Sequence, residues 1–165
     1  MKILIRLALV AALAAAGAWL WTVLFPSPEE IIRAQLNQMA RYASFNSPQS
    51  QLAALAAANK LSGFFNTNAQ IVLEFPGDEE RTINGRDEIR QDIVAARLSL
   101  DRLKVDFPDI NVTVAPDENS AVADLTIRAE TDGDQDGVAE EMKFTFQKID
   151  GQWLVTRIET VQVLT

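Results

Sequence analysis

The clearest local signal in this chain is the segment Phe144-Thr145-Phe146-Gln147-Lys148-Ile149-Asp150-Gly151-Gln152-Trp153. Phe144 and Phe146 alternate with polar residues, which is the pattern of a half-buried strand. Asp150-Gly151 follows, and this dipeptide is typical of two-residue hairpin turns. A last strand then runs from Gln152 to about Leu164. The segment therefore predicts an antiparallel hairpin near the C-terminal end of the sequence.

Further alternating runs precede this hairpin. Residues 103–107 and 110–114 both alternate, but the parity switches at Pro108-Asp109, which predicts a bulge or a sharp bend. Residues 121–130 give another strand after a turn at 117–120. We therefore expect four long antiparallel strands in the second half of the chain, the first of them bent.

The first half reads as helices around a short hairpin. Ser27-Pro28-Glu29-Glu30 combines a capping residue, a Pro in the first turn and a reciprocal Glu, so it predicts a helix start. A second helix is expected from Ser47-Pro48, and a third from Asp87-Glu88, between which residues 69–83 form the hairpin. The expected apolar stripe of the second helix consists of Leu52, Leu55, Ala56 and Leu61.

A family resemblance rests on this order of elements and on two segments of the sequence. They are the turn Ile83-Asn84-Gly85-Arg86-Asp87-Glu88-Ile89 and the closing hairpin at 144–153. Over roughly residues 28–164 the chain resembles the nuclear-transport-factor-two-like superfamily, also called SnoaL-like. The resemblance implies an α+β, cystatin-like fold, in which three helices pack in a curved antiparallel sheet shaped like a cone with a pocket inside.

The resemblance leaves the function open, because fold does not select among the activities of such a family. Its pocket hosts isomerases, dehydratases, hydrolases and polyketide cyclases. Other members dimerise or act in transport without known catalysis. One such set is the single-span inner-membrane subunits of secretion systems, whose periplasmic domain has this fold.

The first 25 residues predict a membrane anchor. Lys2 and Arg6 precede an uncharged run of 19 residues from Leu7 to Phe25. As a helix this run would span about 28 Å, close to the hydrocarbon thickness of a bilayer. Basic residues before the run and acids after it place the N-terminus in the cytoplasm. We therefore divide the chain into an anchor, residues 1–25, and a periplasmic or otherwise extracytoplasmic domain, residues 26–165.

A cleaved signal peptide is the alternative, and it would make the domain secreted. Ala12-Leu13-Ala14 and Ala14-Ala15-Ala16 both fit a cleavage pattern of small residues. Cleavage there would leave an apolar segment, residues 19–25, at a soluble N-terminus. The uncleaved anchor is therefore favoured.

Composition excludes several classes of function. The chain has 165 residues and a net charge of −8, which argues against a nucleic-acid partner. Since Lys2 and Arg6 are the only charged residues before Pro26, residues 26–165 hold 13 bases and 23 acids, a net charge of −10. There is no Cys and no His, which excludes disulfides, thiolate chemistry and the commonest general base.

Few residues remain as candidates for catalysis. Tyr42, near the end of the first helix, could donate to a substrate oxygen, but packing at the core edge with a solvated hydroxyl is favoured, because no partner base can be named. The strand carboxylates Asp124, Glu159 and Asp106 could act as a base if burial raised their pKa. Alternation instead predicts a cross-strand charge ladder on the solvated or dimer-facing side of the sheet.

The segment Asp132-Gly133-Asp134-Gln135-Asp136-Gly137 matches the first half of a calcium loop. The carboxylates of Asp132, Asp134 and Asp136 would be the metal ligands. Position twelve, however, is Lys143 instead of the bidentate Glu, and the flanks read as strands. Turn chemistry alone also accounts for the segment, so no cofactor is expected, with weakly bound calcium as the alternative.

Six basic residues surround the third helix and could face anionic lipid head groups or an acidic partner. A solvated face with ion pairs such as Asp87 to Arg90 and Asp101 to Arg97 is favoured, because acids interleave with them. The six basic residues are Arg81, Arg86, Arg90, Arg97, Arg102 and Lys104.

From the sequence we expect a membrane-anchored, exported SnoaL-like domain that binds a small ligand or a protein without catalysis. A homodimer or a membrane-complex partner through the sheet face is the expected assembly. The first alternative is an enzyme of the isomerase, dehydratase or cyclase kind that uses a buried carboxylate with Tyr42. The second is a calcium-stabilised structural module.

Overall fold

A computed structural model describes residues 12–17, 26–74, 80–132 and 134–161, excluding the side chains of residues 134–136. Residues 12–17 are helical and exposed. No helix in the described ranges is both long and apolar enough to cross a membrane. Most of the expected anchor at residues 7–25 lies outside those ranges, so the anchor stays a prediction.

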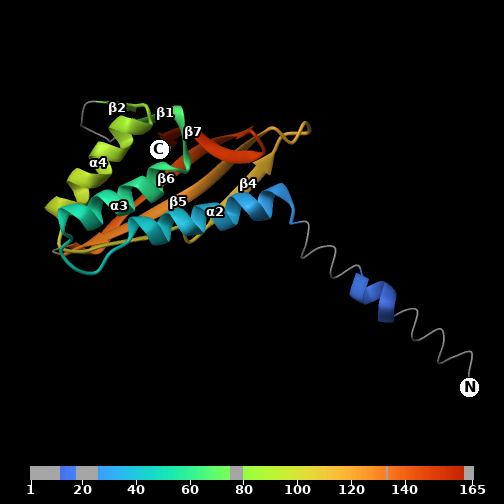
Figure 1. Cartoon of the computed structure of the whole chain (residues 1–165), viewed down its shortest axis with the longest axis horizontal. Coiled ribbons are helices and arrows are strands. Elements are labelled where there is room, and N and C mark those ends of the chain that lie inside the picture. The colour runs from blue at the N-terminus through green and yellow to red at the C-terminus, as the bar shows by residue number, and fades with distance from the viewer. Residues whose placement is uncertain (1–11, 18–25, 75–79, 133, 162–165) are drawn as a thin grey trace, which may run out of the picture.

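Three helices lie along one face of a sheet (Figure 1). They are α2 (Pro28–Ala43), α3 (Gln51–Ser62) and α4 (Arg86–Ser99). The predicted capping box is present at α2, because Glu30 N donates to Ser27 Oγ and Ser27 N donates to Glu30 Oε2. The second helix begins later than predicted, since Ser50 is its N-cap. Ser50 Oγ accepts a hydrogen bond from Ala53 N and thereby satisfies one of the free amides of the first turn.

The sheet contains seven strands. Their bounds are β1 (Phe65–Leu73), β2 (Arg81–Asn84), β3 (Leu103–Asp106), β4 (Ile110–Val114), β5 (Ser120–Thr131), β6 (Asp134–Ile149) and β7 (Gln152–Thr160). The spatial order is β2-β1-β7-β6-β5-β3, with β4 also paired to β5. The predicted hairpins β1–β2 and β6–β7 are both antiparallel. Asp150 and Gly151 adopt positive φ angles of 50° and 80°, as the predicted two-residue turn requires.

The expectation of a wholly antiparallel sheet is wrong at one pairing. β1 lies parallel to β7, with Ile71 opposite Ile158 and Val72 opposite Glu159. These two strands are far apart in sequence, so no turn motif marks their pairing or its direction. The sheet is therefore mixed, and the fold is α+β with an unclosed, curved sheet against three helices.

The predicted bend at Pro108-Asp109 separates β3 from β4, and both strands pair antiparallel with β5. β3 runs beside residues 128–131 and β4 beside residues 121–125. Arg33 of α2 donates from Nη1 to the backbone oxygen of Ile110, so α2 is fastened to the sheet just after the bend.

The core lies between the helices and the inner face of the sheet. Its largest fully buried side chains are Phe144, Phe146, Ile32, Leu36 and Val155. The predicted apolar stripe of α3 is wrong at Leu52, Leu55 and Ala56, which are exposed. The helix instead buries Ala54, Ala58 and Leu61. Leu52 is 78% exposed and Leu55 is 42% exposed. An Ala-rich helix is apolar on all sides, so periodicity alone does not identify which face packs.

Candidate functional site

Aromatic side chains fill the interior of the cone. Phe144 and Phe146 point inward from β6 and are 2% and 0% exposed. Their ring centroids lie 6.4 Å apart, and Phe107 lies 6.2 Å from Phe144. Met39 and Leu36 of α2 belong to the same buried cluster. These side chains form one buried apolar cluster over the middle of the sheet.

Tyr42 lies in the last turn of α2 and is half-buried. Its hydroxyl accepts a hydrogen bond from Gln38 Nε2 at 2.9 Å. The ring lies 6.0 Å from the Phe64 ring, and Lys60 Nζ lies 5.7 Å from the Tyr42 ring centroid. Tyr42 thus packs at the core edge, on the helical side of the sheet.

Asp124 and Glu159 lie on the opposite, outer face. In the paired strands, Asp124 stands opposite Lys143, and Lys143 stands opposite Glu159. Glu159 accepts a hydrogen bond from Arg157 Nε at 2.7 Å and lies 3.9 Å from Lys143 Nζ. The structure brings both carboxylates to one charge ladder, as the alternation predicted, but it does not bring Tyr42 to them.

Arg157 extends this ladder toward the edge of the sheet. It donates from Nη1 to Gln70 Oε1 at 2.5 Å, and Gln70 Nε2 donates to Asn84 Oδ1 at 3.0 Å. We call the set Asn84, Gln70, Arg157, Glu159 and Lys143 the outer-face network. Its side chains are held in place by one another while they remain partly exposed to solvent.

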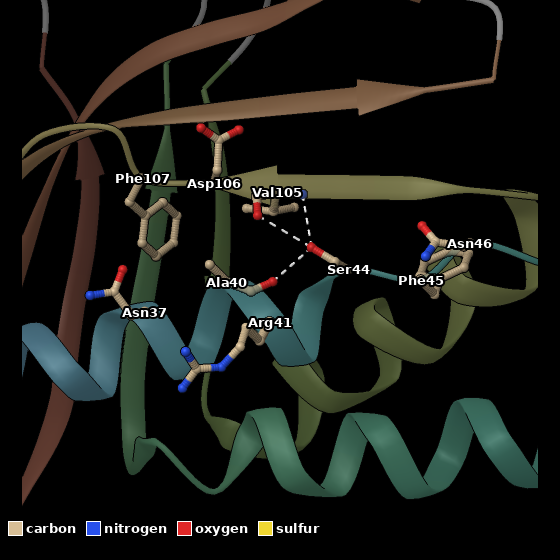
Figure 2. A pocket seen from close by; sticks show the side chains of 9 residues that line it. All are labelled: Asn37, Ala40, Arg41, Ser44, Phe45, Asn46, Val105, Asp106 and Phe107. Carbon is tan, nitrogen blue, oxygen red and sulfur yellow. Dashed lines mark hydrogen bonds between the residues drawn. The ribbon is translucent and has the colours of Figure 1, made fainter.

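Asp106 lines a hollow of about 440 Å³ between α2 and β3 (Figure 2). Figure 2 shows Asp106 pointing away from α2, whereas Phe107 points toward it. Ser44 joins the two walls, because its Oγ donates to Ala40 O and accepts from Val105 N. Asp106 Oδ1 is buried and has no hydrogen-bond partner in the described part of the chain. The side chain of Asp106, at the end of β3, and that of Phe107, the next residue, point in opposite directions. The Asp106 carboxylate is therefore not directed at the helical wall of this hollow.

A second hollow, of about 580 Å³, lies at the end of the sheet beside the bend. We call it the end pocket. Its apolar lining includes the buried side chains of Leu125 and Met142, and its charged residues are Arg33, Asp109, Asp124 and Glu141. The full lining is Arg33, Pro108, Asp109, Ile110, Asn111, Asp124, Leu125, Thr126, Glu141, Met142 and Val161.

Hydrogen bonds fix the rim of the end pocket. Thr126 Oγ1 donates to Asp109 Oδ2 at 3.2 Å, and Arg33 holds the backbone oxygen of Ile110. Val161 N donates to Glu141 O at 2.8 Å and closes the far side. A concave site with an apolar lining and a few placed polar groups is the usual form of a small-molecule site. Asp124 is the only residue among the sequence candidates of the predicted enzyme that lines it.

A third hollow, of about 970 Å³, is a groove between α2 and the β6–β7 hairpin. Ile31, Ala34, Gln35 and Gln38 form its helical wall. Trp153 lies on the other side, where its backbone oxygen accepts from Gln35 Nε2 at 2.9 Å. Trp153 Nε1 is buried and lacks a hydrogen-bond partner among the described residues. The groove is open along most of α2 and does not gather charged groups of one sign.

In the acidic segment at 132–137, Asp132 follows the end of β5 and residues 134–137 are the first residues of β6, while Gly133 lies outside the described residues. Asp132 accepts from Arg102 Nε at 2.9 Å, and the neighbouring Glu130 accepts from Lys104 Nζ at 3.1 Å. The side chains of Asp134 and Asp136 lie outside the described residues. Within the described part of the chain, no three acids are grouped so that they could hold a metal. Calcium binding stays a prediction.

The basic residues around α4 do not form a single solvated face. Arg90 pairs with Asp87 at 3.3 Å, as predicted, and Arg81 pairs with Asp92 at 2.8 Å. The expected pair between Asp101 and Arg97 is wrong, because Arg97 is only 4% exposed. Its guanidinium donates to Tyr42 O, to Ala43 O and to Gln49 Oε1. Burial lowers the pKa of the Arg97 guanidinium below its ordinary value.

Sequence reasoning missed the residues that build the end pocket. Arg33 lies on a predicted helix, Asp109 at a predicted bend and Glu141 in a predicted strand, and none carried a functional signal of its own. The parity switch at Pro108-Asp109 was the one available clue, because bulges and bends occur often beside binding sites.

Neither the family models nor the curated proteins give a match to this chain. Solved structures do resemble it. An NTF2-like protein with a cystatin-like fold from Novosphingobium aromaticivorans has a TM-score of 0.55 and 20% identity, covering 90% of this chain and 86% of its own. A candidate scytalone dehydratase from the same organism has a TM-score of 0.59 and 14% identity, over 82% and 83%.

The yeast Ubp3-associated protein Bre5 has a TM-score of 0.58 and 15% identity, covering 84% of this chain and all of that one. Identities this low show shared architecture and not shared function. The neighbours include a protein assigned to catalysis and a protein known by its association with another. The domain from α2 to β7 therefore has the NTF2-like, cystatin-like fold.

Proposed function

We propose that this chain is a single-pass membrane protein, N-terminus in the cytoplasm, whose exported NTF2-like domain binds without catalysing. The observation that carries this proposal is the separation of the candidate catalytic groups. Tyr42 packs on the helical side of the sheet, while Asp124 and Glu159 stand on the outer face. A general base needs to reach the same substrate as its partner acid, and this arrangement does not offer that.

The end pocket is the proposed ligand site. Leu125 and Met142 provide an apolar surface, and Asp109, Asp124 and Glu141 provide acceptors at its rim. Arg33 is the only basic residue in the lining, and its Nη1 already donates to Ile110 O. The pocket therefore suits a small molecule with an apolar body and hydrogen-bond donors. In this proposal Asp124 binds and does not catalyse.

The methionines allow a direct test. The chain has three Met residues, Met1, Met39 and Met142. Met142 lines the end pocket, whereas Met39 is buried in the core on α2. Isotope-labelled methionine methyl groups therefore give one reporter for the pocket and one internal control. We would screen a fragment library against the full chain in detergent by methyl NMR.

The expected result is a set of fragments that shift the Met142 methyl signal and leave the Met39 signal in place. The variant Val161→Trp should abolish these shifts, because Val161 lines the pocket and is partly exposed. If no fragment moves Met142, or if Val161→Trp changes nothing, the pocket is not a ligand site. If a bound fragment is chemically converted, and the conversion is lost when Asp124 is replaced, the chain is an enzyme and the non-catalytic proposal is wrong.

We also propose that the outer face of the sheet binds a second copy of this chain. The outer-face network supports this, because its members already hold one another and lose little side-chain freedom on association. Thr145 and Val122 lie in the middle of this face, in one cross-strand row with Arg157. Bre5, which has this architecture, is named for its association with another protein, and this supports a binding role as a proposal.

A further inference from the structure

An apolar patch covers neighbouring turns of α3 and α4. Leu52 is 78% exposed, Leu55 42% and Leu98 50%. Leu55 and Leu98 face the same hollow of about 440 Å³, together with Val94 and Ala95. We call Leu52, Leu55, Val94, Ala95 and Leu98 the leucine patch. Single exposed leucines are ordinary on a protein surface, but a contiguous apolar patch marks a surface that contacts something else.

The fold does not use these leucines internally. α3 packs through Ala54, Ala58 and Leu61, so Leu52 and Leu55 are directed away from the core. Replacing them by polar residues would leave the described core packing intact. Their apolar character therefore needs a reason outside the domain.

The charges around the leucine patch are unusual for this acidic domain. α3 contains no acid, and its only charged residue is Lys60. Each acid of α4 is engaged: Asp87 with Arg90, Glu88 with the backbone amide of Asn84, and Asp92 with Arg81. Arg90 is the only charged residue that lines the hollow. Residues 26–165 have a net charge of −10, yet the lining of this hollow holds no acid and one basic side chain, Arg90, whose partner Asp87 lies outside the lining. Leucines beside a basic side chain suit a surface that faces lipid phosphates.

The attachment point puts a bilayer within reach. In the proposed topology the membrane segment ends at Phe25, and Ser27 already caps α2. One residue, Pro26, separates them, so the domain cannot move far from the lipid surface. α2 has 16 residues and is about 24 Å long. Figure 1 shows the start of α3 and the end of α4 beyond the C-terminal end of α2.

We propose that the leucine patch rests on the surface of the bilayer that the N-terminal segment enters, with α2 lying along the membrane. This inference rests on the membrane anchor of the proposed function. The domain would then touch the membrane at two places, the anchor and the leucine patch. Such contact leaves the outer face of the sheet, on the other side from the helices, available to a partner.

The chain has no Cys, so a single introduced Cys can carry a nitroxide spin label. The full chain with Leu98→Cys is reconstituted into nanodiscs of phosphatidylethanolamine and phosphatidylglycerol. Power-saturation EPR then compares the access of oxygen, which concentrates in lipid, with that of a water-soluble nickel chelate. Thr145→Cys on the outer face, combined with Val122→Arg so that no second copy covers the label, is the matched control, and Leu52→Cys gives an independent second reading.

The labels at Leu98 and Leu52 should be relaxed by oxygen and protected from nickel, whereas the Thr145 label should be open to nickel. Nickel access at Leu98 and Leu52 equal to that at Thr145 would overturn the docking while leaving the anchor in place. Spin–spin broadening at Leu98 would show that a second copy of the chain covers the leucine patch, and this result would also overturn its docking on the bilayer. A chain lost from the nanodiscs would overturn the docking and the anchor together.

Discussion

The guanidinium of Arg97, on α4, donates a hydrogen bond to the backbone oxygen of Tyr42 in the last turn of α2. The same side chain donates to Gln49 Oε1 at 3.0 Å and stacks over the Phe45 ring with a 4.8 Å separation. One buried cation therefore joins α4, the end of α2 and the connection to α3. A cation at a helix C-terminus also interacts favourably with the helix dipole.

Replacing Arg97 with Met should destabilise the domain by about 2 to 4 kcal/mol, because buried carbonyl oxygens would lose their donor. Urea unfolding of the full chain in detergent, followed by circular dichroism, measures this. Arg90→Met is the matched control on the same helix, since the half-exposed pair of Arg90 with Asp87 contributes less than about 1 kcal/mol. Equal effects of the two substitutions would show that Arg97 is not buried as described.

The packing face of α3 makes a second prediction. Ala58→Leu should cost about 1 to 3 kcal/mol, because Ala58 is fully buried and the core has no room for three more carbons. Leu52→Ala should change the unfolding free energy by less than about 0.5 kcal/mol, because Leu52 is exposed. Urea midpoints of the two variants give the comparison. If Leu52→Ala destabilised the domain more than Ala58→Leu, α3 would pack through the leucine stripe that the sequence predicted.

Several local signals in the sequence predicted the local structure correctly, although the start and the packing face of α3 were not among them. The capping box at Ser27 and Glu30, the bend at Pro108-Asp109 and the turn at Asp150-Gly151 all depend on residues that are close in the chain. Each is fixed by backbone chemistry within a few residues. The order of helices and strands followed from these signals together with hydrophobic periodicity.

Features that depend on distant residues were missed. No residue next to β1 or β7 in the sequence indicates that these strands run parallel. Likewise, no residue next to Arg97 in the sequence indicates that its guanidinium donates to the backbone oxygen of Tyr42. The end pocket combines α2, the bend and three strands, so its residues share no motif. A sequence pattern also cannot separate a carboxylate that lines a pocket from one that stands in a row of charges across the sheet. Asp124 lines the end pocket and stands opposite Lys143.

The proposed homodimer predicts a cross-linking pattern. The full chain with Thr145→Cys, in membranes, should give a dimer with a short bis-maleimide, because Thr145 lies in the middle of the outer face. Ala96→Cys, exposed on α4, is the control and should remain monomeric. Adding Val122→Arg to Thr145→Cys should abolish the dimer, since the new side chain would project into the interface. A dimer from Ala96→Cys alone would place the interface on the helices instead.

Calcium should leave the melting temperature unchanged. Asp132 is already paired with Arg102, so a cation would have to displace that contact before binding. Melting of the full chain in excess calcium and in a chelator measures the difference, because a ligand that binds only the folded state raises the melting temperature. A saturable rise that is lost in Asp134→Asn would make the 132–137 segment a calcium site.

The bilayer contact of the leucine patch presupposes that the domain is held at a membrane, and the proposed topology places the domain outside the cytoplasm. The most direct measurement uses Ala96→Cys in intact bacterial cells, treated with a maleimide that does not cross the membrane. We predict labelling without lysis, on a chain of full mass that stays in the membrane pellet after an alkaline wash. Labelling only after lysis would place the domain in the cytoplasm. A labelled chain of lower mass in the soluble fraction would show a cleaved signal peptide, and either result would contradict the account.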